Sequence, residues 1–140
     1  MDESLTRELC RHVERRSYQL VEAAERFLRD HRWITSNQAH GLANVISSEE
    51  KNVNTVLVAY VQHQGRKATS QNNRFWEDLK RELEGLRKQA QEIQEDLGND
   101  ALTPRETKEQ LARIHMLIVR DYVQHLVAHN EYQRAMVGDK

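Results

Sequence analysis

The C-terminal third of the chain carries the pattern that most constrains its fold. Thr103 is a good helix N-cap, and Pro104 suits the first helical position, where an N–H is not needed. Glu106 can close a capping box with Thr103. Beyond them, apolar and ring-bearing side chains recur every three or four residues and so share one helical face. They are Leu111, Ile114, Ile118, Tyr122, His125, His129, Tyr132 and Met136. The spacing predicts one long helix from Thr103 to about Met136, covered on several sides within a bundle.

Three earlier segments repeat this helical spacing. The first covers residues 3–31. The second follows Thr35, where Gln38 completes a second capping box, and continues to a C-cap at Gly65. The third covers residues 73–97, and its apolar residues alternate four and three apart in a heptad-like seam. That seam consists of Leu79, Leu83, Leu86, Ala90, Ile93 and Leu97.

Composition agrees with a helical fold and sets limits on its surroundings. Among 140 residues there are one proline and five glycines, so helix breakers are few. We predict an all-α fold, a single-domain bundle of four long helices over residues 1–140, with room for one extra short helix. The single cysteine, Cys10, excludes an internal disulfide and suits a reducing compartment. No apolar run approaches the roughly 18 residues of a membrane helix, so we expect a cytoplasmic protein without membrane contact.

The sequence lacks the patterns that support most enzyme and metal chemistry. It contains no glycine-rich phosphate loop, no Gly-x-Ser-x-Gly elbow, no paired cysteines and no Glu-x-x-His. His125 and His129 are four residues apart and share a helical face, but spacing identifies no third ligand for them. We therefore predict a protein that is not an enzyme and has no metal or cofactor. A metal-binding bundle enzyme built on these two histidines is the least favoured alternative.

Charge is distributed unevenly over the third segment and the polar stretch before it. Residues 66–88 hold seven basic and four acidic side chains, although the whole chain has a formal net charge of −1. Arg74, Arg81 and Lys88 are seven residues apart, on the side away from the seam. Arg66 and its neighbour Lys67 follow the second predicted helix, where they either balance its dipole or contact phosphate groups. Composition alone favours the dipole interpretation.

Three stretches, taken in order, resemble one protein family. Residues 34–38, Ile-Thr-Ser-Asn-Gln, are similar to its Ile-Thr-Thr-Ser-Gln-like helix start. Ala59-Tyr60 followed by Gly65-Arg66 resembles its Ala-Tyr, short gap and Gly-Arg. Residues 122–132 are similar in order and spacing to its closing helix, which begins with Tyr or Phe and ends in Tyr-His-Lys-Tyr. The family is the small helical subunit of type III-A CRISPR (Csm) RNA-guided interference complexes.

The resemblance implies a non-catalytic role in RNA-guided antiviral defence. Such subunits stack in copies along the guide–target RNA duplex, contact the other subunits of the type III effector, and help to hold target RNA. Carried over by motif, Arg66 contacts the nucleic-acid backbone, with Lys67 beside it. Arg74, Arg81 and Lys88 complete the predicted nucleic-acid-binding set on charge alone. The alternative is a homo-oligomeric helical adaptor that uses the seam of residues 73–97 and has no nucleic-acid role.

Overall fold

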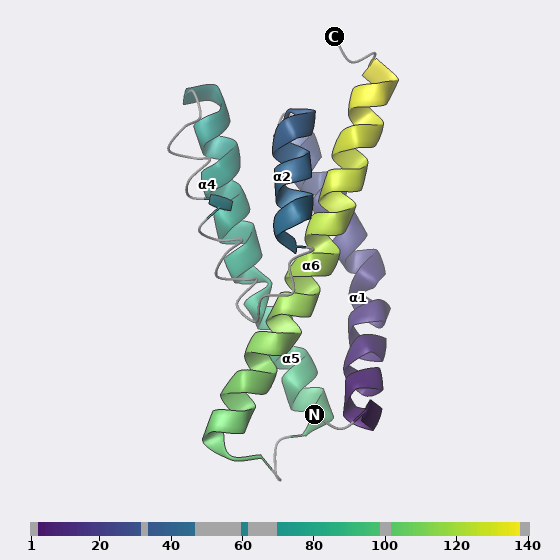
Figure 1. Cartoon of the computed structure of the whole chain (residues 1–140), viewed down its shortest axis with the longest axis vertical. Coiled ribbons are helices and arrows are strands. Elements are labelled where there is room, and N and C mark those ends of the chain that lie inside the picture. The colour runs from purple at the N-terminus through teal and green to yellow at the C-terminus, as the bar shows by residue number, and fades with distance from the viewer. Residues whose placement is uncertain (1–2, 32–33, 47–59, 62–69, 99–101, 138–140) are drawn as a thin grey trace.

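The structure, a computed structural model, describes residues 3–31, 34–46, 60–61, 70–98 and 102–137 (Figure 1). Its helices are α1 (Glu3–Asp30), α2 (Ser36–Ile46), α4 (Ser70–Gly85), α5 (Arg87–Leu97) and α6 (Pro104–Val137). The all-α helical bundle predicted from the sequence is confirmed. None of the helices described combines the length and the apolarity needed to pass through a lipid bilayer.

The long helix α6 is the element against which the others pack. It contacts α1, α2 and α5, and it runs the full height of the bundle, with α5 beside its lower half and α2 beside its upper half (Figure 1). Two polar contacts join it to α4 and α5. Nε2 of the buried His115 lies 2.9 Å from the carbonyl oxygen of Leu83 in α4. From α5, Nε2 of Gln94 donates to the carbonyl oxygen of Thr107 at 3.1 Å. These bonds fix α4 and α5 along α6.

Both predicted capping boxes are present. The hydroxyl of Thr103 accepts from the N–H of Glu106 at 3.2 Å, and the Glu106 carboxylate accepts from the N–H of Thr103 at 3.1 Å. Thr35 and Gln38 make the same reciprocal pair at 3.2 and 3.0 Å. Each box satisfies N–H groups that a helix start leaves without a partner, so these two helix starts follow directly from local sequence.

The helix predicted over residues 73–97 begins at Ser70 and is divided at Leu86 into α4 and α5. The division is slight. Leu86 keeps helical dihedral angles, its N–H bonds to the Glu82 carbonyl at 3.2 Å, and its own carbonyl accepts from Ala90 at 3.2 Å. The two helices therefore carry one continuous surface past the junction at Gly85.

The prediction of one continuous helix from Thr35 to Gly65 is wrong. Within the described residues α2 ends at Ile46, and helical structure appears again at Tyr60 and Val61. A Cβ added to Gly41 would lie 2.9 Å from Cζ of Tyr60, so the two residues are in contact. In one straight helix they would be about 28 Å apart. Periodicity alone does not distinguish one long helix from two segments that pack against each other.

The predicted apolar seam of α4 and α5 is buried inside the chain's own bundle. Of its six residues all but Leu97 are fully covered, and Leu97 packs against the core at its edge. On α6, however, the buried stripe stops near Asn130. Tyr132 and Met136, predicted to continue it, are 58% and 67% exposed, because no described helix covers that side of the last two turns of α6.

Candidate nucleic-acid interface and the adjacent pocket

Three of the five predicted nucleic-acid-binding residues lie in the described part of the chain. Arg74 and Arg81 project from α4 with 84% and 79% of their side chains exposed, and Lys88 is exposed on α5. Successive members are seven residues apart, so about 10 Å of helix separates them on nearly the same side. Arg66 and Lys67 lie outside the described residues. We call Arg74, Arg81 and Lys88 the cation row.

One acid joins the first two members of the cation row to α1. The carboxylate of Asp78 lies 3.6 Å from Nε of Arg74 and 3.6 Å from Nη1 of Arg81. Its Oδ2 atom is also 2.7 Å from Nε2 of His31. The hydrogen bond from His31 lowers the pKa of the Asp78 carboxyl, and the charges of His31 and the two arginines act in the same direction against the effect of burial. Asp78 is therefore ionised at neutral pH.

The same histidine is held from its other side. Nδ1 of His31 lies 2.8 Å from the carbonyl oxygen of Phe27, and a carbonyl only accepts hydrogen bonds. Because the partner of Nε2 is an ionised carboxylate, both bonds form together only when both ring nitrogens carry protons. Phe27 stacks on the His31 ring at 4.2 Å between ring centroids, and Phe75 meets both rings edge-on. This cluster fixes the end of α1 against the start of α4.

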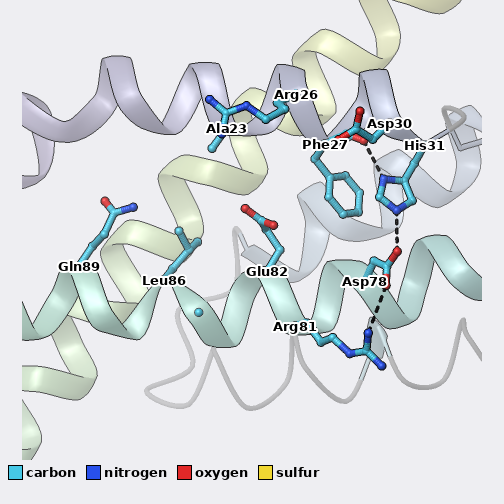
Figure 2. Close-up of a pocket in the computed structure, with 11 residues that line it drawn as sticks. Ala23, Arg26, Phe27, Asp30, His31, Asp78, Arg81, Glu82, Leu86 and Gln89 are labelled. Carbon is cyan, nitrogen blue, oxygen red and sulfur yellow. Dashed lines mark hydrogen bonds and ion pairs between the residues drawn. The ribbon is translucent and has the colours of Figure 1, made fainter.

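A pocket of about 530 Å³ opens between α1 and the α4–α5 surface, next to this cluster (Figure 2). Arg26 extends from α1 on one wall, and Glu82 points toward it from α4 on the other. Within the described residues neither side chain makes a hydrogen bond or an ion pair within 4 Å. The remaining lining residues are Ala23, Phe27, Asp30, His31, Asp78, Arg81, Gly85, Leu86 and Gln89. Arg81 thus belongs both to the cation row and to the pocket.

Burial raises the pKa of the Glu82 carboxyl above its ordinary value of 4.5, and the charges of Arg26 and His31 oppose this. A raised folded-state pKa stabilises the protein below about pH 4.5, and that contribution is lost as the pH rises through the folded-state value. We therefore expect Glu82→Gln to melt at a higher temperature than the unsubstituted protein at pH 7. The advantage should shrink as the pH falls toward 4.5, measured by thermal unfolding across the pH range. The exposed Glu77→Gln is the control, and an equal gain there would contradict the assignment to burial.

A second polar cluster joins α1 to α6 through Ser17, Asp121 and His125. Oγ of Ser17 donates to Oδ2 of Asp121 at 3.1 Å and lies 3.1 Å from Nε2 of His125. That same Nε2 atom is 3.3 Å from Oδ2 of Asp121. In a catalytic triad the serine and the acid contact different nitrogens of the histidine ring. Here they share one nitrogen, so the acid does not orient the ring to take a proton from the serine.

His125 and His129 do not converge on a common point. His129 places Nδ1 4.0 Å from a carboxylate oxygen of Glu25, whereas His125 faces Ser17 and Asp121. Across the described residues no group of three or more histidine, cysteine or acidic side chains is arranged to hold a metal ion. The two-histidine pattern seen in the sequence therefore corresponds to two separate contacts between α6 and α1.

Sequence reasoning found the cation row but missed the pocket beside it. The residues that define the pocket come from α1 and from α4–α5, and no motif or spacing links Arg26 to Glu82 or His31 to Asp78. The only local signal is Gly85, a glycine inside an otherwise helical pattern. Comparison with known protein families, with curated proteins and with solved structures finds no match to this chain.

Proposed function

We propose that this chain is a non-catalytic small subunit of a cytoplasmic type III CRISPR ribonucleoprotein effector. In this proposal copies of it pack along the guide–target RNA duplex and against the other subunits, and they help to hold target RNA. The supporting observation is the cation row, in which Arg74, Arg81 and Lys88 are exposed along one side of α4–α5. A linear series of cations suits the regular phosphate spacing of a nucleic-acid backbone.

The ion pairs of Arg74 and Arg81 with Asp78 are compatible with phosphate binding. Both arginines are highly exposed, and exposed pairs contribute only about 0–1 kcal/mol, so a phosphate can compete for the guanidinium groups. A single copy offers few such contacts and has a net charge of −1, so it should hold RNA weakly. Several copies fixed in one complex gain effective concentration and together bind more tightly.

The buried seam of α4–α5 counts against one form of the alternative function. An adaptor that pairs through this seam would need the seam exposed, but it is covered by the chain's own helices. A different surface supports the adaptor as a second candidate. Tyr132 and Met136 are one turn apart on α6, and both are exposed. An adaptor without an RNA role would use this end of α6 for protein contact.

Gentle purification of the tagged chain from its native cells tests the proposal. RNA of uniform length and larger protein subunits should accompany it. If the chain emerges alone, or as a dimer free of RNA, the effector proposal is overturned and the adaptor takes its place. Substitution of Tyr132 and Met136 by Ser should then abolish the dimer.

Neutralising the cation row should weaken the retention of target RNA. We expect the Arg74→Gln, Arg81→Gln, Lys88→Gln triple variant to lower the dependence of log affinity on log salt by roughly 0.7–0.9 per lost phosphate contact. The matched control removes the same charge from α6 with Arg105→Gln, Lys108→Gln and Arg113→Gln, all exposed. RNA retention measured across a salt series separates the two. An equal loss in both variants would indicate a general charge effect and would reject the cation row.

A further inference from the structure

The pocket between α1 and α4–α5 holds opposite charges apart. Arg26 and Glu82 lie on opposite walls without forming an ion pair; Arg26 is exposed, whereas Glu82 is only partly exposed. The partly buried carboxylate of Glu82 receives no hydrogen bond from the described residues, so a ligand with N–H donors adds charge-assisted hydrogen bonds there. A small cation would be repelled by Arg26, and a small anion by Glu82. The walls suit a ligand with N–H donors at one end and an anionic group at the other.

A buried acceptor without a hydrogen-bond partner lies on the Glu82 side of the pocket. Gln89 is two turns further along α4–α5, and its Oε1 atom is buried without a hydrogen-bond partner. Between Gln89 and Glu82, the wall at Gly85 is open. A Cβ added there would meet no atom within 4 Å, so neither packing nor a left-handed conformation explains the glycine. Glycine at a helical position costs about 1 kcal/mol relative to alanine, and here it leaves room beside the Glu82 carboxylate.

The geometry points to a guanine nucleotide as the ligand of this pocket, with Glu82 accepting from the base, Gln89 lining the same wall and Arg26 contacting the phosphate. Guanine alone among the four RNA bases presents two adjacent donors, N1–H and the N2 amino group, that match the two oxygens of one carboxylate. Adenine and cytosine place a ring acceptor beside their amino group, and uracil places its N–H between two carbonyl oxygens. Each of these would direct a lone pair at Glu82.

This inference rests on the proposed function and specifies which part of the RNA the site contacts. A volume of about 530 Å³ lies within the usual range for small-ligand sites. Arg81 lines the pocket and also belongs to the cation row, so a strand that follows the row passes the mouth of the pocket. Proteins that read RNA sequence commonly contact the Watson–Crick edges of unstacked bases.

Titration of the isolated full chain with guanosine 5′-monophosphate, adenosine 5′-monophosphate and ribose 5-phosphate, followed by amide NMR shifts, tests the assignment. We expect the guanine nucleotide to bind at least about tenfold more tightly than the adenine nucleotide, a difference of about 1.4 kcal/mol. The perturbed amides should include those of Glu82, Gly85 and Gln89. Equal affinity for all three compounds would reveal a phosphate site only and would overturn the assignment. So would the absence of guanine nucleotide binding at about 10 mM.

Two variants connect the discrimination to the pocket. Glu82→Gln should reduce the guanine-to-adenine ratio to about twofold or less, because an amide offers one acceptor and one donor to the base edge. Glu77→Gln, exposed on the same helix, should leave the ratio unchanged. Gly85→Leu should fill the opening and weaken guanine nucleotide binding at least tenfold, while thermal unfolding shows that the helix is not destabilised. Unchanged discrimination in Glu82→Gln would also overturn the assignment.

The failure of this inference can be distinguished from the failure of the proposed function. If the purified complex holds RNA but the isolated chain does not discriminate between nucleotides, the pocket assignment fails and the effector role stands. If the chain comes without RNA yet discriminates guanine through Glu82, the effector role fails and the pocket is a nucleotide site of another protein class. In a complex that does carry RNA, Glu82→Gln should deplete guanine from the protected positions without lowering the total RNA.

Discussion

Trp76→Ala should cost about 3–5 kcal/mol of the free energy of unfolding, the largest single effect we expect. Trp76 is fully buried at the start of α4. Its ring meets Phe75 edge-on at 5.1 Å and Tyr60 edge-on at 6.3 Å between centroids. Truncation removes these contacts and leaves a cavity between α4 and its neighbours. Because α4 carries Arg74 and Arg81, we also expect RNA retention to fall with the folded fraction.

Trp76→Phe provides the matched comparison for this site. The indole Nε1 is buried and has no hydrogen-bond partner, so removing its N–H eliminates an unfavourable group while an aromatic ring remains. We expect a loss below about 1.5 kcal/mol, because a smaller ring still fills most of the volume. Urea unfolding of both variants measures the difference. Similar losses in the two variants would mean that the indole N–H, and not ring packing, stabilises the site.

Local signals in the sequence account for three of the helix boundaries. The capping boxes at Thr35 and Thr103 and the C-cap at Gly98, where φ is +78°, involve residues within a few positions of each other. Such patterns satisfy backbone groups at helix ends whatever the rest of the chain does. The heptad-like seam likewise predicted the buried face of α4–α5, because core-facing positions repeat with the helical period.

Features that depend on how helices pack against each other were not predicted. His31 and Asp78 are 47 residues apart, and only the antiparallel packing of α1 and α4 brings them to 2.7 Å. The contact of Gly41 with Tyr60 likewise contradicts a helix that periodicity alone supported. Tyr132 continues the apolar spacing of α6, but none of the described helices packs against this side of α6, so Tyr132 is exposed. Periodicity identifies the face of a helix, whereas burial depends on the presence of a neighbour.

The distribution of polar groups relates the fold to the proposed function. Asp78 holds Arg74 and Arg81 on the outer side of α4, while His31 joins the same acid to α1. Asp78 and His31 therefore link two members of the cation row to α1. The pocket lies between the same two elements, so its shape depends on how α1 packs against α4–α5. A rigid bundle suits a subunit that must keep such groups in register with an RNA backbone.

Asn130→Leu should cost about 1–3 kcal/mol, the second large effect. Asn130 is 1% exposed on α6, and its Oδ1 accepts from the N–H of Ile34 at 2.9 Å. Its Nδ2 donates to the Ile34 carbonyl oxygen at 3.2 Å, an acceptor that Arg134 also contacts at 3.2 Å. Leucine would leave the buried Ile34 N–H without a partner, at about 1–3 kcal/mol, while Arg134 still satisfies the carbonyl.

This pair joins two segments that are 96 residues apart in sequence. Ile34 begins one of the stretches that resemble the small-subunit family, and Asn130 lies in another, so loss of the bond should loosen the start of α2 from the end of α6. Gln124→Leu, on the exposed side of α6, makes a comparable amide-to-leucine change without this bond and should alter stability by less than about 0.5 kcal/mol. Urea unfolding together with amide exchange at Ile34 measures both effects. If the Ile34 amide exchanges fast in Asn130→Leu but stays protected in Gln124→Leu, Asn130 anchors this end of the bundle. Equal protection of the Ile34 amide in both variants would show that it does not.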